Sequence, residues 1–129
     1  MQISDWHLDL AYTPGRVKEN CKQEICCNAN NPIAQEGEGA GLFGELTGCD
    51  IPLKTCQGQM EWLKQNLRGD QKPDLILWTG DNISHDMVTV TVDQVIYSIQ
   101  VLTDLIKETY PDVPLVVSLG NHDFEPANI

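Results

Sequence analysis

The sequence has few basic residues, few aromatic residues and very few histidines. Its 129 residues include 8 lysines and arginines against 19 aspartates and glutamates, which gives a formal net charge of −11 at pH 7. Non-specific binding to nucleic acid depends on lysine and arginine neutralising phosphates, so this composition argues against a nucleic-acid polymer as a partner. Because the chain has only 3 histidines, their positions carry much of the chemical argument.

Long apolar runs are missing as well. No stretch approaches the roughly 18 to 20 apolar residues that span a bilayer, so no transmembrane segment is expected. No basic start is followed by an apolar segment, so no signal peptide is expected within this chain. Hydrophobic residues make up 41% of the sequence, a share that suits a globular protein.

The apolar pattern predicts an α/β fold in the order β-loop-α-β-α-β, with a mainly parallel sheet and right-handed crossovers. A short strand ends before Asp5, and residues 10–50 are expected to form a loop. Steps of three and four residues then predict one inward face of a helix, which should end near Arg68 with a C-cap at Gly69. That face comprises Leu53, Cys56, Met60, Leu63 and Leu67.

Two further strands and a second helix complete the predicted order. The run Leu75–Trp78 is typical of a strand buried on both faces. Thr91 and Gln94 have the spacing of a capping box that opens the second helix, and Leu115–Leu119 is expected to form the third strand. The residues of the second helix expected to face inward are Val92, Val95, Ile96, Ile99, Leu102 and Ile106.

Residue types that bind metals follow each of the three predicted strands. They occur in Asp5-Trp-His7, Gly80-Asp81-Asn82 and Gly120-Asn-His-Asp123. In open parallel α/β sheets, ligands collect beyond the carboxyl ends of the strands, so the three segments should meet at one edge. Each motif alone also fits a structural turn or a structural histidine. The three in this order, each after its own strand, favour a metal site.

Phosphoryl chemistry requires residues of these types. Two divalent ions about 3.5 to 4 Å apart can clamp a phosphoryl group and lower the pKa of a shared water. Asp5 and His7 are two residues apart, so in an extended segment both side chains point to one side. Asp81 is the natural bridging carboxylate, and Asn121 offers an amide oxygen. His122 could protonate a leaving alkoxide.

The order of these motifs resembles the calcineurin-like metallophosphoesterase superfamily, and their surroundings resemble its acid sphingomyelinase-like branch. The narrower match rests on the spacing of His7, Asp9, Tyr12 and Gly15, on the adjacent Cys26-Cys27, and on the segments 48–52 and 77–86. The similarity runs along essentially the whole chain. It implies that the fold is part of a metallophosphoesterase α/β sandwich.

The resemblance also implies residue roles. Asp5 and His7 would bind a first metal, Asp81 would bridge, and Asn121 would bind the second. His122 would stabilise the transition state or protonate the leaving group, and His85 matches a second active-site histidine. The two divalent ions are expected to be zinc.

Asp123 has two alternatives that the sequence leaves open. It could orient the imidazole of His122, as carboxylates around metal sites commonly do. It could equally be an acid in a surface turn.

The family completes its metal site with histidines in Gly-His and Gly-His-x-His segments downstream of Asn-His-Asp, and this chain has none after His122. We therefore expect residues 1–129 to be an incomplete catalytic domain, the N-terminal part, without a second domain. Alone it should be inactive and hold one ion weakly.

The cysteines bear on the compartment. Cys21, Cys26, Cys27 and Cys49 lie in the 10–50 loop, which gains from cross-links because it lacks a core of its own. Zinc binding by these cysteines is the alternative, but they form no paired Cys-x-x-Cys units. The resemblance implies disulfides between Cys21 and Cys26 and between Cys27 and Cys49, hence an extracellular or lysosomal protein. Cys56, on the helix face, is expected to be a buried, inert thiol.

The leading hypothesis is a metal-dependent phosphodiesterase of the acid sphingomyelinase-like type. Its substrate would be a phosphodiester such as sphingomyelin or a nucleotide derivative, and the intact parent could meet lipid at a membrane surface. The alternative is a non-catalytic secreted module, a disulfide-stapled α/β unit that binds a partner or a single ion. A cytosolic protein phosphatase of the same superfamily is a weaker idea, because the paired cysteines count against it.

Overall fold

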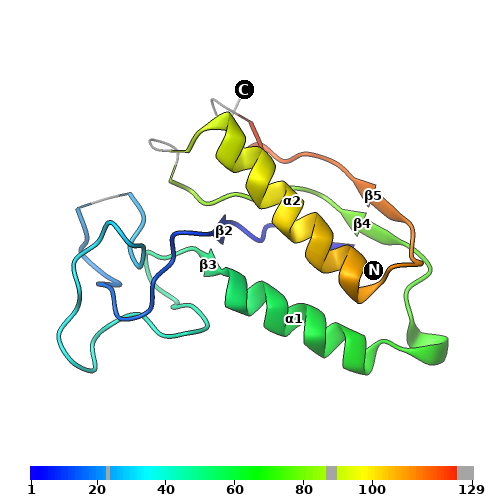
Figure 1. The fold of residues 1–129 in the computed structure, drawn as a ribbon, viewed down its shortest axis with the longest axis horizontal. Helices are drawn as coiled ribbons and strands as arrows, with labels where there is room; N and C mark the ends of the chain where they lie inside the picture. The colour runs from blue at the N-terminus through cyan, green and yellow to red at the C-terminus, as the bar shows by residue number, and fades with distance from the viewer. Residues whose placement is uncertain (23, 87–89, 125–129) are drawn as a thin grey trace.

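The structure is a computed structural model that describes residues 1–22, 24–86 and 90–124. It confirms the α/β class and the parallel strands (Figure 1). The elements in chain order are β1 (Gln2–Ile3), β2 (Leu8–Asp9), β3 (Ile51–Pro52), α1 (Leu53–Asn66), the 3-10 turn η1 (Gly69–Gln71), β4 (Ile76–Trp78), α2 (Val92–Thr109) and β5 (Leu115–Val117).

Strands β1, β4 and β5 form one parallel sheet in that order. Both crossovers step in the same direction across the sheet, so right-handed connections place α1 and α2 on the same face. The core between the helices and the sheet is a single apolar cluster. Its buried members are Ile3, Trp6, Leu8, Cys56, Met60, Ile76, Trp78, Leu102, Ile106 and Tyr110.

The opposite face of this sheet is open. Leu77 of β4 is paired in register with Val116 of β5, and these side chains are 43% and 54% exposed. The prediction that Leu75–Trp78 is buried on both faces is therefore wrong, because both helices cover the side that holds Ile76 and Trp78. The third strand is also shorter than predicted and ends at Val117.

Helix α1 buries the predicted face. Cys56 and Met60 are fully buried, and Leu53 and Leu63 pack against the same core. The predicted end of this helix is wrong by two residues. The helix ends at Asn66 with Leu67 as its cap, and Gly69, although at φ 58°, lies beyond the cap and opens the 3-10 turn η1.

Helix α2 begins at the predicted capping box. The Thr91 hydroxyl accepts from the Gln94 N–H, and the Gln94 side chain accepts from the Thr91 N–H. The prediction is wrong for two of the residues expected to face inward, because Val92 and Ile96 are 53% and 60% exposed. Val92 and Ile96 lie one turn apart, outside the buried stripe of this helix, and that stripe includes the polar Ser98. The buried residues of the helix are Val95, Ser98, Leu102 and Ile106.

The predicted 10–50 loop lies between β2 and β3 and, among its described residues, has no helix or strand (Figure 1). Its two ends form a parallel pair, β2 with β3, that the sequence did not predict. Both implied disulfides, Cys21–Cys26 and Cys27–Cys49, are formed. Cys26 and Cys27 pack with Ala40 in a small core of their own. Among the described residues, no helix is long and apolar enough to cross a membrane.

Candidate active site

The segments after β1 and β4 continue side by side beyond the strands. The Asp5 N–H donates to the Gly80 carbonyl at 3.0 Å, and the His7 N–H donates to the Asp81 carbonyl at 3.0 Å. The next bond, from Leu8 N–H to the Asn82 carbonyl, is 2.8 Å long. These bonds bring two of the three predicted segments together at the carboxyl edge of the sheet, as parallel strand order requires.

Asp5, His7 and Asp81 form a compact group whose potential ligand atoms all lie within 4.8 Å of one another. The backbone that achieves this is not the extended one predicted. All three residues have positive φ, at 54°, 40° and 55°. This left-handed region is uncommon for residues other than glycine, and such strain concentrates at functional sites. The side chains thus converge through turns rather than through the alternation of a strand.

The third segment is bonded to the second. The His122 N–H donates to Oδ1 of Asp81 at 2.9 Å. The Asp123 carboxylate accepts from the N–H groups of Asp81, Asn82 and Gly120 at 2.8 to 2.9 Å. Asp123 is buried, so it is not an acid exposed in a surface turn, and its carboxylate also accepts from the Asn82 side-chain amide at 2.9 Å. No described contact joins it to the His122 ring, so its predicted role in orienting that imidazole stays a prediction. Its carboxylate fixes the turn that carries Asp81.

Two glycines allow these turns to meet. Gly80 has φ 89°, and a Cβ there would collide with the backbone at Leu119 and Gly120. A Cβ on Gly120 would collide with Asp81. The close approach of the two turns therefore requires glycine at both positions.

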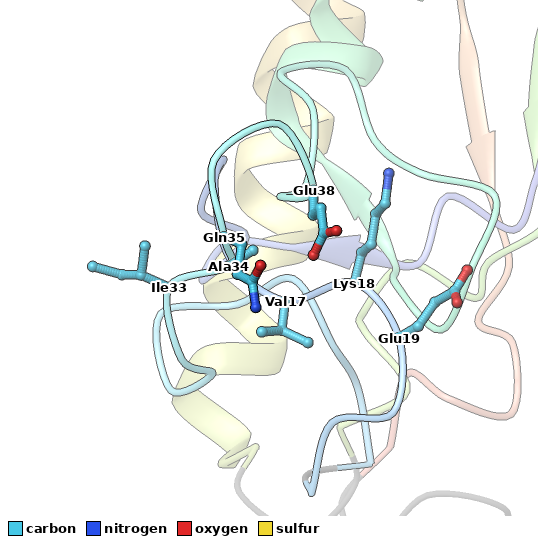
Figure 2. Close-up of a pocket in the computed structure, with 7 residues that line it drawn as sticks. All are labelled: Val17, Lys18, Glu19, Ile33, Ala34, Gln35 and Glu38. Atoms are coloured by element: carbon cyan, nitrogen blue, oxygen red, sulfur yellow. The ribbon is translucent and has the colours of Figure 1, made fainter.

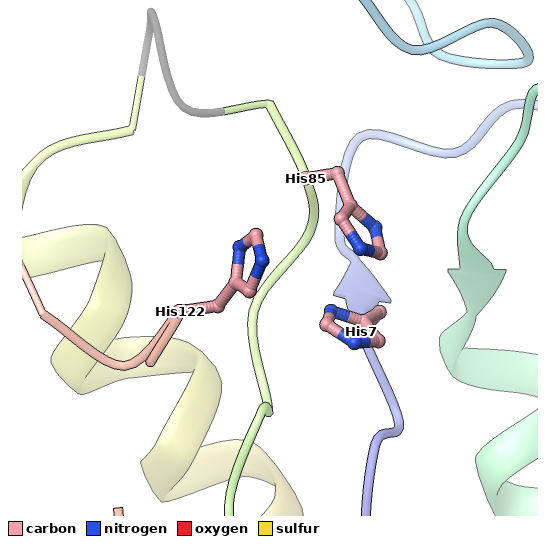
Figure 3. Close-up of side chains that lie close together, drawn as sticks. All are labelled: His7, His85 and His122. Atoms are coloured by element: carbon pink, nitrogen blue, oxygen red, sulfur yellow. The ribbon is translucent and has the colours of Figure 1, made fainter. Parts of the chain in front are cut away.

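All three histidines of the chain lie together (Figure 3). The rings of His7 and His85 are stacked with centroids 3.9 Å apart, and the ring of His122 lies 4.7 Å from His85 and 5.1 Å from His7. Nitrogen atoms of the three rings come close enough to suggest a shared ion. A metal binds an imidazole nitrogen in the plane of the ring, however, so two stacked rings do not aim both lone pairs at one ion. His7 fits the carboxylate group better.

The tautomer of His7 suits a ligand role. Its Nδ1 lies 3.0 Å from the Ile83 carbonyl, which can only accept, so Nδ1 carries the proton and Nε2 keeps its lone pair. His85 shows the same pattern with a different partner, since its Nδ1 lies 2.8 Å from Oδ1 of Asp50. Asp50 was not among the site residues predicted from the sequence. The available signal was its place in the segment 48–52, one of the segments on which the resemblance rests.

The remaining predicted residues lie at the edge of the group. Nδ1 of His122 is buried and has no hydrogen-bond partner among the described residues. Asn121 is exposed beside it. Carboxylates, an imidazole and an amide form a donor set that suits zinc, manganese or iron, so the residues present fit a divalent ion.

The whole chain, residues 1–129, matches the family described as calcineurin-like phosphoesterase. The chain belongs to this family. The acid sphingomyelinase-like resemblance is also confirmed, because named sphingomyelin phosphodiesterases and an acid sphingomyelinase-like phosphodiesterase align with almost the whole chain.

Sphingomyelin phosphodiesterase B of Dictyostelium discoideum is 33% identical over 99% of this chain and 20% of its own length. The sphingomyelin phosphodiesterase of Homo sapiens is 30% identical over 98% of the chain and 19% of its own length. The acid sphingomyelinase-like phosphodiesterase 3b of Mus musculus is 35% identical over 98% of the chain and 25% of its own length. The chain thus spans about a fifth to a quarter of these curated relatives.

Within this calcineurin-like phosphoesterase chain, a buried acid lies next to the site. Burial is the largest cause that raises the pKa of the Asp9 carboxyl to about 6. The hydrogen bond from the Ala11 N–H acts against it, whereas the charges of Asp50 and Asp86 raise the pKa further. Cys56 is the buried thiol predicted, and burial raises its pKa to about 12.

A hollow of about 480 Å³ lies elsewhere, in the cysteine-bearing loop of residues 10–50 (Figure 2). Lys18, Glu19 and Glu38 contribute charged side chains to its lining. None of the predicted site residues lines it, so this hollow has no part in the chemistry of the three histidines.

Proposed function

We propose that this chain is the N-terminal part of the catalytic domain of a metal-dependent phosphodiesterase of the acid sphingomyelinase-like type. The observation that carries the proposal is the group formed by Asp5, His7 and Asp81. All three residues have left-handed backbone conformations, and their potential ligand atoms converge. Two further histidines lie in ring contact with this group. Backbone strain of this kind clusters at functional sites, and three strained residues whose ligand atoms converge support a role in metal binding.

Asp5 and His7 would hold one divalent ion, Asp81 would bridge to a second, and Asn121 would bind that second ion. Zinc is the metal we propose, since His and carboxylate ligands suit it. When bound, two such ions clamp a phosphoryl group and supply hydroxide near neutral pH. The Asp123 carboxylate keeps the Asp81 turn in place through bonds of 2.9 Å to Asp81 N–H and 2.8 Å to Asn82 N–H.

His85 and His122 would serve the phosphoryl group and the leaving group. When charged, each can donate a hydrogen bond to a phosphoryl oxygen or give a proton to the departing alkoxide. Their rings are 4.7 Å apart and both lie beside His7, so a single bound phosphodiester could meet both.

The substrate we propose is a phosphodiester, either sphingomyelin or a nucleotide derivative. The names of the relatives favour sphingomyelin, which the parent would meet at a membrane surface. One relative differs: an endopolyphosphatase of Kluyveromyces lactis is 31% identical over the whole chain and 20% of its own length. Polyphosphate is therefore the comparison substrate that an assay should include.

The two disulfides support an oxidising compartment, so we propose an extracellular or lysosomal protein. The open sheet face supports the proposal that the catalytic domain is larger than residues 1–129. The apolar side chains of Leu77 and Val116 are 43% and 54% exposed there. In a complete sandwich, further residues would cover them and supply the downstream histidines.

The test begins with metal binding by the 129-residue chain. Zinc content is measured by mass spectrometry after loading, for the natural sequence, for Asp81→Asn and for Asp74→Asn, an exposed acid before β4. We expect Asp81→Asn to lose bound zinc and Asp74→Asn to keep it. Equal binding by all three chains would sink the proposed site.

Activity is tested in the longer protein with a chromogenic phosphodiester, sphingomyelin vesicles and polyphosphate. Asp81→Asn should nearly abolish turnover while leaving the fold intact. The competing function is a non-catalytic secreted module, favoured by the small core of the cysteine-bearing loop. It would be supported if the longer protein lacked turnover on all three substrates while binding zinc normally.

A further inference from the structure

Asp50 holds His85 at two points. Its Oδ2 accepts the His85 backbone N–H at 2.6 Å, and its Oδ1 lies 2.8 Å from His85 Nδ1. An ionised carboxylate only accepts hydrogen bonds, so Nδ1 carries the proton and Nε2 keeps the lone pair. The Asp50 side chain is 8% exposed and the His85 side chain 43%, so the buried carboxylate is the fixed partner of the pair.

Asp50 is itself fixed by both of its neighbours in the chain. Cys49 is bonded to Cys27 through a disulfide. Ile51 pairs with Leu8 between β3 and β2, and its N–H donates to the His7 carbonyl at 3.2 Å. Asp50 therefore lies between the Cys27–Cys49 disulfide and a residue that is bonded to the backbone of His7, a proposed metal ligand.

The pair reaches the proposed site through ring contacts. The His85 ring stacks on His7 at 3.9 Å and lies 4.7 Å from His122 (Figure 3). With the backbone and Nδ1 of His85 both bound by Asp50, rotation of this ring is restricted, and Nε2 is the nitrogen left for a ligand.

We propose that Asp50 is a positioning residue for His85, setting its ring orientation and its tautomer so that Nε2 serves the substrate. The role of His85 rests on the proposed function, whereas the tautomer does not. The tautomer can therefore be tested without any assay of activity.

Asp50→Asn is the discriminating variant because it keeps the size of the side chain. The amide oxygen can still accept the His85 backbone N–H, but the amide NH₂ then faces Nδ1 and can only donate. We expect the proton of neutral His85 to move from Nδ1 to Nε2. Nitrogen-15 NMR of the imidazoles in the 129-residue chain, at alkaline pH where histidine is neutral, reads the tautomer directly.

Glu45→Gln is the matched control. Glu45 is another carboxylate of the same loop, bonded to the Gly41 N–H at 2.8 Å and to Lys18 at 3.2 Å, and no described contact joins it to a histidine. It should leave the His85 tautomer unchanged. The proposal is overturned if the natural chain carries the proton on Nε2, or if Asp50→Asn leaves the tautomer as it was.

Turnover in the longer protein separates this inference from the proposed function. We expect Asp50→Asn to lower kcat by about 10- to 100-fold, the range typical for hydrogen-bonding partners of the histidines of metal sites, with little change in KM. Full turnover despite a switched tautomer would overturn the positioning role. Turnover retained by Asp81→Asn would instead overturn the proposed function and leave the NMR result on Asp50 standing.

Discussion

Asp5, His7 and Asp81 hold left-handed backbone conformations that cost about 1 to 2 kcal/mol each for residues with a Cβ. Hydrogen bonds between neighbouring backbones maintain them, such as Asp5 N–H to the Gly80 carbonyl at 3.0 Å. The residues with strained backbone are the same residues that are proposed to bind metal. At these positions the proposed metal binding therefore lowers the stability of the fold.

Replacing Asp5 by glycine should therefore separate stability from metal binding. We expect Asp5→Gly to raise the free energy of unfolding by roughly 0.5 kcal/mol, because relief of strain exceeds the entropy cost of glycine. Zinc affinity should fall at the same time. Asn20→Gly is the control, since Asn20 also has positive φ, at 55°, but lies outside the site. Chemical denaturation and zinc titration measure both effects, and unchanged zinc affinity in Asp5→Gly would contradict the ligand assignment.

At Gly80, unlike at Asp5, the backbone conformation and the close packing require glycine. Gly80→Ala adds a Cβ against the backbone of Gly120 at a positive φ, so we expect it to lower the free energy of unfolding by about 2 kcal/mol or more. Gly58→Ala, in helix α1 with open space around it, should instead raise that free energy by about 0.5 to 1 kcal/mol. Urea denaturation of both variants tests the pair, and equal effects would count against the close approach of the two turns.

Asp9 predicts how stability changes with pH. Its folded-state pKa of about 6 lies above the ordinary value, chiefly because the carboxyl is buried. Because the folded pKa is raised, the contribution of Asp9 to the free energy of unfolding is most favourable below about pH 4. That contribution is lost as pH rises through 6, where the buried carboxyl ionises. Raising the pKa of Asp9 from 3.8 to about 6 lowers the free energy of unfolding above pH 6 by roughly 3 kcal/mol.

Asp9→Asn removes this titration. The free energy of unfolding of the variant should therefore gain on that of the natural chain between pH 4 and pH 7. Asp70→Asn, an exposed acid, controls for the loss of one charge. Denaturation at several pH values measures the difference, and a difference between Asp9→Asn and the natural chain that is constant with pH would refute the prediction.

Among the elements, the helices could be predicted from the sequence and the strand environments could not. The capping box at Thr91 and the spacing of Cys56 and Met60 are local signals, and both are confirmed. The exposure of Leu77 depends on which face the crossovers cover, and that is decided by the order of strands far apart in the chain. Asp50 was missed for a similar reason, since its histidine lies 35 residues away.

The cysteine-bearing loop depends on its disulfides, because it lacks regular structure among its described residues. The Cys27–Cys49 bond joins residues 22 apart, and Cys21–Cys26 joins residues 5 apart. In the chain-entropy model, replacing the first pair by serine should cost about 3 kcal/mol and replacing the second about 2 kcal/mol. Thermal denaturation of the two double variants tests this ranking. A larger loss for Cys21–Cys26 would show that contacts of the loop, rather than chain entropy, set the order.

At the scale of the whole molecule, a sheet covered on one face is an unusual arrangement for parallel strands, which are normally buried on both. Leu77 and Val116 lie next to one another on the open face. The net charge of −11 opposes self-association of the chain through this apolar surface. The proposed larger domain would remove the exposure by packing further residues against it.

Leu77→Lys distinguishes an open face from a covered one. In the 129-residue chain Leu77 is 43% exposed, so a lysine can reach water and the free energy of unfolding should change by less than about 0.5 kcal/mol. In the longer protein the same lysine would be buried without a partner, and we expect a loss of about 3 kcal/mol or more. Ile96→Lys, on the exposed side of α2 at 60%, should have little effect in both proteins if the added residues cover only the sheet. Chemical denaturation of the four variants measures these changes in the free energy of unfolding. An equally small effect of Leu77→Lys in both proteins would mean that the additional residues of the longer protein do not pack on this sheet. The histidines proposed to complete the metal site would then have to reach it from another direction.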